Sequence, residues 1–168
     1  RLLPMLIHPF NPVYNTESRI LILGTFPSVA SRAEQFYYGH PKNRFWKVLS
    51  ELTGNSLPET VEEKKALLFK KRIALWDVLK SCDIELSKDS SIMNPVVNDF
   101  DDILKETSVQ AIFTNGKKAE ELYKRLCFPK THVKSRCLPS TSPANASWSY
   151  ERLLQAWSTI LHYIKEQG

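Results

Sequence analysis

The chain alternates between short runs of apolar residues and longer stretches in which apolar positions recur with helical spacing. The runs 20–23 and 73–76 are typical of strands buried on both faces of a sheet. Two further strands are predicted at 109–114 and 133–138. Strands that alternate with helices form a parallel sheet covered on both faces. The pattern therefore predicts the α/β class, as a three-layer α/β/α sandwich around a central four-stranded, mostly parallel sheet.

Helical periodicity marks the segments between these strands. The apolar positions within 45–52 fall at i, i+3, i+4 and i+7, so a helix is predicted to begin at Pro41 and to end at Gly54. Further helices are predicted at 58–71, from Asn98 or Asp99 to Lys105, across 119–126 and across 153–164. These helices supply the two outer layers.

Two segments lack a regular period. Residues 1–18 place prolines among apolar residues and are predicted to lie extended over the body as an arm. Residues 80–98 are polar and irregular and are interpreted as a surface excursion. A chain of 168 residues can bury one substantial core, so 1–168 is expected to form a single domain.

Composition and charge narrow the class of protein. The chain is 42% hydrophobic and 24% charged, which excludes disordered and fibrous proteins. It has no apolar stretch long enough to span a bilayer and no signal-peptide pattern, so we expect a soluble, intracellular, cytoplasmic protein with no membrane partner. The net charge of +5 suits a polyanionic partner.

The three cysteines are Cys82, Cys127 and Cys137, and none forms a Cys-x-x-Cys pair. Because they are odd in number and far apart, they are interpreted as reduced thiols. No spacing suits a zinc site or an iron–sulfur cluster, and no glycine-rich phosphate loop is present. We therefore expect neither metal nor cofactor.

The candidate site lies where the predicted strands end. Ligands of open α/β sheets bind at the carboxyl ends of the strands, where the loops after Leu23, Trp76, Thr114 and Leu138 should meet. Segment 36–46 adds aromatic rings, an amide and cations within eleven residues. We interpret these loops and this segment as one site.

Three motifs occur in order along the chain. They are Leu-Gly-Thr-Phe-Pro-Ser at 23–28, Tyr-Gly-His-Pro-Lys-Asn-Arg-Phe-Trp at 38–46, and Leu-Pro-Ser-Thr-Ser-Pro-Ala-Asn at 138–145. Together they resemble the uracil-DNA glycosylase superfamily, and within it the hypoxanthine-DNA glycosylase branch. The resemblance runs from about Arg19 to about Ile164. It implies a monofunctional DNA repair enzyme that flips a deaminated base out of DNA and hydrolyses its N-glycosidic bond. We expect the protein to be a monomer.

Two side chains that are familiar in this superfamily are absent. Uracil-removing relatives carry Asn or Asp where this chain has Phe26, and many carry His where it has Leu138. The resemblance to the hypoxanthine branch instead points to Asn43 as the catalytic residue, whose side chain would orient the attacking water. The alternative is that Asn43 caps a helix.

The predicted base pocket combines the loop after Leu23, segment 36–46 and the end of the strand at 73–76. It comprises Gly24, Thr25, Phe26, Pro27, Phe36, Tyr37, Trp76 and Asp77. Backbone N–H groups at Thr25 and Phe26 would stabilise charge on the leaving base, and the Phe26 ring would stack on it. The aromatic residues at 36–38 are alternatively core residues, although three in a row cannot all point inward.

Asp77 is predicted to read the base edge, at a position where uracil-removing relatives place an asparagine. An ionised carboxylate accepts hydrogen bonds only, so it would favour the N1–H of hypoxanthine over the N1 acceptor of adenine. The alternative is that Asp77 caps a helix or pairs with a lysine. The other histidines, His8, His132 and His162, have no sequence neighbours that suggest ligation or a nucleophile pair.

A separate set is predicted to contact DNA phosphates. It comprises Ser28, His40, Lys42, Arg44, Lys117, Ser140, Thr141, Ser142, Pro143 and Asn145. The alternative for 139–146 is an ordinary connection to a helix capped by Asn145 or Ser147, and for His40 a hydrogen bond within its loop.

Hypoxanthine release is thus the expected function, with DNA containing deaminated bases as the partner. Two alternatives stay open: a uracil-DNA glycosylase of the mismatch-specific type, and a non-catalytic nucleic-acid-binding domain on the same fold.

Overall fold

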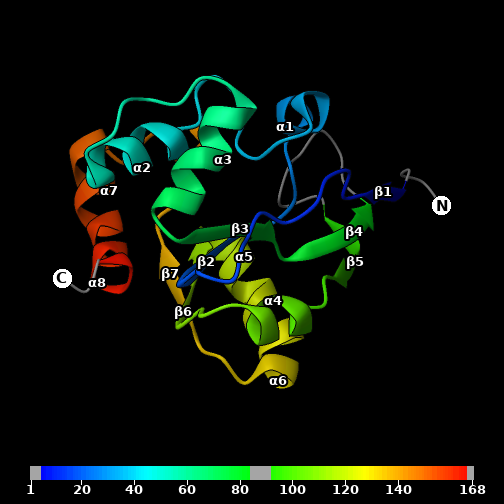
Figure 1. Cartoon of the computed structure of the whole chain (residues 1–168). Coiled ribbons are helices and arrows are strands. Elements are labelled where there is room, and N and C mark those ends of the chain that lie inside the picture. The colour runs from blue at the N-terminus through cyan, green and yellow to red at the C-terminus, as the bar shows by residue number, and fades with distance from the viewer. Residues whose placement is uncertain (1–4, 84–91, 166–168) are drawn as a thin grey trace.

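A four-stranded parallel sheet forms the centre of the computed structural model, which describes residues 5–83 and 92–165 (Figure 1). Its strands are β2 (Ile20–Gly24), β3 (Ile73–Asp77), β6 (Ala111–Asn115) and β7 (Ser135–Leu138), in the order β3-β2-β6-β7. All three pairings are parallel, and Gly24 lies opposite Asp77 at the carboxyl ends of β2 and β3. The predicted sheet is confirmed.

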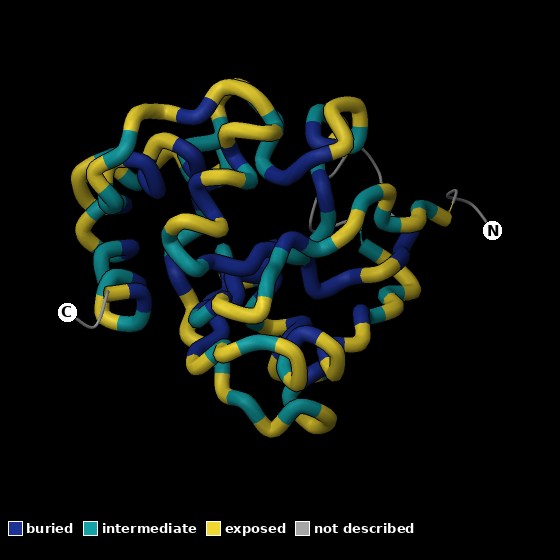
Figure 2. Tube along the Cα trace, in the orientation of Figure 1, coloured by how far each residue is buried: buried dark blue, intermediate teal, exposed yellow. Residues whose placement is uncertain are grey.

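Both faces of the sheet are covered, and β2 shows why. Ile20 and Ile22 pack into the core cluster on one face, whereas Leu21 and Leu23 pack into the cluster on the other. The first face is covered by α2 (Phe45–Thr53), α3 (Val61–Lys70), α7 (Tyr150–Trp157) and α8 (Leu161–Ile164). The second is covered by α4 (Asp101–Glu106), α5 (Lys117–Leu122) and α6 (Phe128–Thr131). Figure 2 shows the sheet as the buried centre of the molecule, and the three-layer sandwich is confirmed.

Helix boundaries follow local capping chemistry. Thr60 and Glu63 form a reciprocal capping box at the start of α3, and Gly54 ends α2 in the left-handed conformation, as predicted. Ser149 caps α7, so the alternative in which Asn145 or Ser147 caps this helix is wrong. The last helix is divided by a 3₁₀ turn over Ser158–Ile160.

The start of α2 also differs from the prediction. The helix begins at Phe45 rather than at Pro41, because the backbone N–H of Asn43 donates to the His40 carbonyl and closes a turn first. The short helix α1 (Val29–Glu34), which Ser28 caps, was not predicted. A helix of six residues offers too few apolar positions for a period to be recognised.

A second, antiparallel sheet adjoins the carboxyl end of β3. Its strands are β1 (Met5–Ile7), β4 (Leu79–Asp83) and β5 (Met93–Val97), in the order β1-β4-β5. The interpretation of 80–98 as an irregular excursion is therefore wrong for its described parts, while 84–91 lies outside the described residues. Because β1 pairs with β4, the amino-terminal arm is anchored beside the predicted site.

Among the described residues, no helix is both long and apolar enough to cross a membrane.

Candidate active site

A cavity of about 310 Å³ opens at the carboxyl ends of β2, β3 and β6. It is lined by Gly24, Thr25, Phe26, Pro27, Ser28, Ser31, Tyr37, Tyr38, Asn43, Asp77, Asn115, Ser140, Thr141, Ser142 and Ala144. This volume lies at the small end of the range for ligand sites. All three sequence motifs contribute to the lining, so the structure brings them together as the sheet topology predicts.

Several predicted site residues lie outside this lining. Phe36 is buried in the core and stacks on Trp46, with ring centroids 6.1 Å apart. Trp76 packs edge-to-face against Phe100. Six residues of the set predicted to contact DNA also do not line the cavity. They are His40, Lys42, Arg44, Lys117, Pro143 and Asn145.

Asp77 lies at the end of β3 and is hydrogen-bonded to a histidine from the amino-terminal arm. The Nε2 of His8 lies 2.8 Å from Oδ2 of Asp77, and the two side chains are only 4% and 5% exposed. The Nδ1 of His8 accepts the N–H of Phe10 at 3.4 Å, so the ring proton belongs on Nε2, which donates to the carboxylate. The sequence around His8 gave no sign of this contact, because its partner is distant in the chain.

Gly24 allows two polar side chains to approach the end of β2. A Cβ atom at this position would lie 2.5 Å from Oδ1 of Asp77 and 3.0 Å from the hydroxyl oxygen of Tyr38. Both distances are shorter than ordinary van der Waals contact, so a larger residue here would displace one of the two side chains.

Asn43 has both a structural contact and a place in the cavity. Its Oδ1 accepts the backbone N–H of Phe45 at 2.9 Å, which supports the turn before α2. The residue also lines the cavity. A carbonyl oxygen has two lone pairs, so this hydrogen bond leaves Oδ1 able to accept another. The capping role and a role in the cavity are thus compatible.

The loop after β7 is held by side chains from two other elements. The Asn115 side chain donates to Oγ1 of Thr141 and accepts the N–H of the same residue, each at 3.0 Å. Arg44 donates from its two terminal nitrogens to the carbonyls of Trp148 and Asn145, at 2.6 and 3.1 Å. The guanidinium of Arg44 therefore positions the loop from within.

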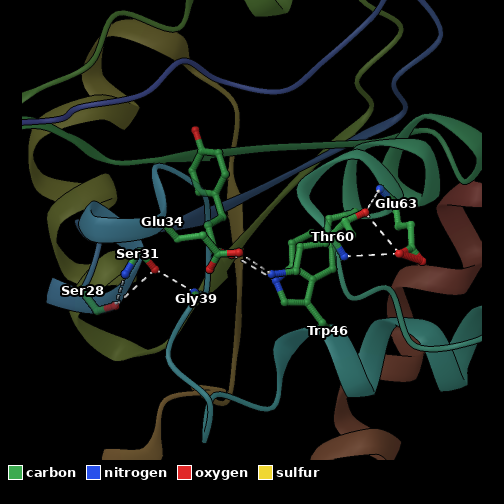
Figure 3. Close-up of polar contacts among 9 residues, drawn as sticks. Ser28, Ser31, Glu34, Gly39, Trp46, Thr60 and Glu63 are labelled. Atoms are coloured by element: carbon green, nitrogen blue, oxygen red, sulfur yellow. Dashed lines mark hydrogen bonds and ion pairs between the residues drawn. The ribbon is translucent and has the colours of Figure 1, made fainter.

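A network on α1 fixes the aromatic segment beside the cavity (Figure 3). Oγ of Ser28 accepts the N–H of Ser31, and Oγ of Ser31 in turn accepts the N–H of Gly39 at 2.8 Å. Glu34, also on α1, forms an ion pair of 3.3 Å with Lys64 of α3. The loop that carries the cavity-lining Tyr38 is thereby tied to two helices.

Tyr37 is both a core residue and part of the cavity wall. It is 2% exposed, and its hydroxyl donates to the Asn11 carbonyl at 2.9 Å. Burial, together with the nearby Asp77 carboxylate, raises the pKa of Tyr37 well above its usual range. The tyrosine therefore stays protonated and holds the arm in place.

The family model that describes the uracil DNA glycosylase superfamily matches residues 12–163 of this chain. The chain belongs to the uracil DNA glycosylase superfamily. The family predicted from the three motifs is confirmed.

Individual relatives agree with this assignment. A protein of Methanosarcina acetivorans named hypoxanthine DNA glycosylase is 37% identical over 162 residues, which cover 95% of this chain and 100% of the relative. A protein of the same name from Methanosarcina barkeri is 36% identical over 115 residues, covering 67% of this chain and 72% of the relative. The solution NMR structure of a candidate uracil DNA glycosylase from Methanosarcina acetivorans superposes with a TM-score of 0.81 at 34% identity, covering 96% and 100% of the two chains.

Phe26 and Leu138, the two positions at which this chain departs from the superfamily motifs, lie in different environments. Phe26 lines the cavity, and its ring lies edge-to-face to His8 with centroids 5.8 Å apart. Leu138, where many superfamily members carry His, is 4% exposed and belongs to the hydrophobic core. Phe26 therefore forms part of the cavity wall, whereas Leu138 is a core residue that does not line the cavity.

Sequence reasoning missed several residues of this cavity. Ser31, Tyr38, Asn115 and Ala144 line the cavity, and His8 supports it from behind Asp77. Asn115 ends the third strand of the sheet, so the strand-end rule was a usable signal for it. His8 gave no signal, because its partner is 69 residues away in sequence.

Across residues 5–83 and 92–165, no group of three or more His, Cys, Asp or Glu side chains is arranged to hold a metal ion.

Proposed function

We propose that this protein is a monofunctional DNA N-glycosylase that releases hypoxanthine from deoxyinosine in DNA and leaves an abasic site. The buried Asp77 carboxylate in the cavity carries the proposal. An ionised carboxylate accepts hydrogen bonds only, so it favours the N1–H of hypoxanthine and repels the N1 lone pair of adenine. Membership of the superfamily and the names of both Methanosarcina relatives support the same activity.

The reaction begins with rotation of the deoxyinosine nucleotide out of the duplex, at a cost of a few kcal/mol. The flipped base enters the cavity and stacks on Phe26. As the N-glycosidic bond breaks, its electron pair passes to the base. The backbone N–H groups of Thr25 and Phe26, in the loop after β2, donate to the negative charge that develops there.

Asn43 positions the water that attacks the sugar carbon. Its Oδ1 accepts from the water with the lone pair that the Phe45 N–H leaves free. An amide is too weakly basic to remove a proton fully, so its contribution is orientation of the nucleophile.

Contacts to the phosphates come from the rim of the cavity. Small hydroxyl residues let backbone N–H groups approach a phosphate closely, and cations supply electrostatic attraction. The proposed contacts are Ser28, His40, Lys42, Lys117, Ser140, Ser142, Pro143 and Asn145. Thr141, which was also predicted to contact a phosphate, is fully buried and bonded to Asn115, so it supports the loop instead. Arg44 contributes indirectly, because its hydrogen bonds hold the loop after β7 in place. We propose that the chain acts as a monomer through a single domain.

Excision assays test the activity directly. Purified protein is incubated with duplexes that carry one inosine or one uracil, and abasic sites are then cleaved with alkali. We expect cleavage at inosine. Preferential cleavage at uracil would reassign the substrate, and binding of the duplex without cleavage at either base would refute the enzyme.

Substitutions at Asn43 and Asp77 test the two roles separately. Asn43→Ala is expected to lower the single-turnover rate by about 100-fold or more, whereas Asn55→Ala, at the other end of α2, leaves it unchanged. If Asn43 only supports the helix start, Asn43→Ala will unfold at a lower temperature but retain the wild-type rate. For Asp77→Asn, an unchanged rate together with unchanged base preference would refute base reading by Asp77.

A further inference from the structure

Tyr38 has two features that the packing of the fold does not explain. Its hydroxyl is shielded from solvent and makes no hydrogen bond of good geometry to any residue that the structure describes. Its backbone lies in the left-handed region, with φ of 55°. Both features are unfavourable for tyrosine, and both occur at a residue that lines the cavity. Such a combination points to a partner that arrives with the substrate.

The ring of Tyr38 is held firmly, so the hydroxyl has a defined position. It stacks on Phe45 with ring centroids 4.2 Å apart and an interplanar angle of 23°. The hydroxyl oxygen lies above Gly24, 3.0 Å from where a Cβ would stand. Burial and the Asp77 carboxylate raise the pKa of Tyr38, and Asn115 offsets this only in part. The hydroxyl therefore keeps its proton as a hydrogen-bond donor.

An acceptor lies beside this donor. Oδ1 of Asp77 is 2.5 Å from the same Cβ position above Gly24, so the two oxygens converge on one point. Oδ2 of Asp77 is engaged by Nε2 of His8 at 2.8 Å. His8 thus fixes the carboxylate with Oδ1 on the side of Tyr38.

Among the groups on base edges, a donor next to an acceptor in this order matches the lactam, a ring N–H next to a carbonyl. Hydrolytic deamination creates this lactam group in both adenine and cytosine, where a ring nitrogen acceptor previously stood next to an amino donor. The parent bases present the reverse order of donor and acceptor. Guanine also contains a lactam, so this donor and acceptor alone do not distinguish it from hypoxanthine.

We propose that Tyr38 is a specificity-determining residue, whose hydroxyl donates to the lactam oxygen of the flipped base while Oδ1 of Asp77 accepts from the adjacent N–H. The inference rests on the proposed glycosylase function and names the chemical group that its cavity reads. As the glycosidic bond breaks, negative charge spreads to the lactam oxygen and the hydrogen bond from Tyr38 strengthens. Tyr38 therefore acts on the rate of base release more than on DNA affinity.

Tyr38→Phe tests the donor because it keeps the ring stacked on Phe45. Single-turnover release is measured from duplexes that contain deoxyinosine or its 6-thio analogue, which keeps the N1–H but carries a weak acceptor. We expect Tyr38→Phe to slow hypoxanthine release by about 10- to 100-fold and release of the thio base by less than about threefold. Tyr14→Phe, which removes a hydroxyl bonded to Glu106 at 3.0 Å, is the matched control and should match the wild type on both substrates.

The outcomes separate this inference from the proposed function. Wild-type protein that releases neither base overturns both. Active wild type with an unchanged Tyr38→Phe rate, or with equal losses on the two substrates, overturns the contact to the lactam oxygen alone. Because the substitution removes an unpartnered hydroxyl, Tyr38→Phe should unfold at the wild-type temperature or above it.

A second measurement does not depend on the folding of a variant. For wild type alone, release of hypoxanthine relative to the thio base, each normalised to its rate of acid-catalysed release, should differ by about tenfold or more. Equal normalised rates overturn the proposal.

Discussion

Replacing His8 with phenylalanine removes one hydrogen bond from the cavity while keeping an aromatic ring in its place. The His8 ring packs against Phe10, Phe26 and Tyr37 with centroid distances of 4.6, 5.8 and 6.0 Å. A phenylalanine ring can preserve these contacts. What it cannot supply is the donor to Oδ2 of Asp77.

The expected cost follows from the burial of both partners. A hydrogen bond to a charged group contributes about 1.5–3 kcal/mol. Asp77 and His8 are almost fully buried, but Asp77 faces a cavity from which water can compensate in part. We therefore expect His8→Phe to lower the free energy of unfolding by about 1.5–3 kcal/mol.

Equilibrium unfolding in urea, followed by tryptophan fluorescence, measures this loss. His162→Phe is the control, because His162 is exposed on α8, and it should change stability by less than about 0.5 kcal/mol. If His8→Phe is as stable as the control, the contact to Asp77 contributes nothing and the reasoning fails. The folded fraction of His8→Phe should also discriminate less well between inosine and adenosine in DNA.

Two further predictions concern the loop after β7 and the thiols. Arg44→Lys cannot donate to both the Trp148 and Asn145 carbonyls in fork geometry, so it should destabilise the protein by about 1–2 kcal/mol and weaken duplex binding; unchanged thermal unfolding would contradict this. Burial raises the pKa of Cys82 and Cys127 to about 11 and also raises the pKa of Cys137, so at pH 8 few of the thiols are ionised and access decides the reaction. A disulfide reagent should therefore label only the exposed Cys137 until the protein is unfolded. Rapid labelling of three thiols in native protein would be inconsistent with this burial.

Strands β2, β3 and β6 of the main sheet were predictable because they are largely apolar runs whose residues are buried on both faces. The antiparallel sheet was not, because β1 and β5 are largely exposed and β4, although mostly buried, carries polar residues that break the apolar pattern. β5 even contains Pro95 and a left-handed Asn94, which are unusual in strands. Pairing with β4 stabilises this segment, and no local pattern reports such pairing.

Some residues of the candidate site were likewise predictable from the sequence, and others were not. The strand-end rule located Gly24 and Asp77, which lie opposite each other in the sheet. It did not place Phe36, which does not lie at a strand end and is buried in the core against Trp46. Nor did it identify His8, whose contact depends on β1 pairing with a strand far along the chain.

The amino-terminal strand is separate from the central sheet in the topology of the molecule. β1 pairs with β4, in the antiparallel sheet, and the donor to Asp77 follows directly after β1 in the chain. Local opening of this arm would therefore leave the parallel sheet intact while it removes the support behind Asp77. Base excision would then report docking of the arm, which helix content alone does not.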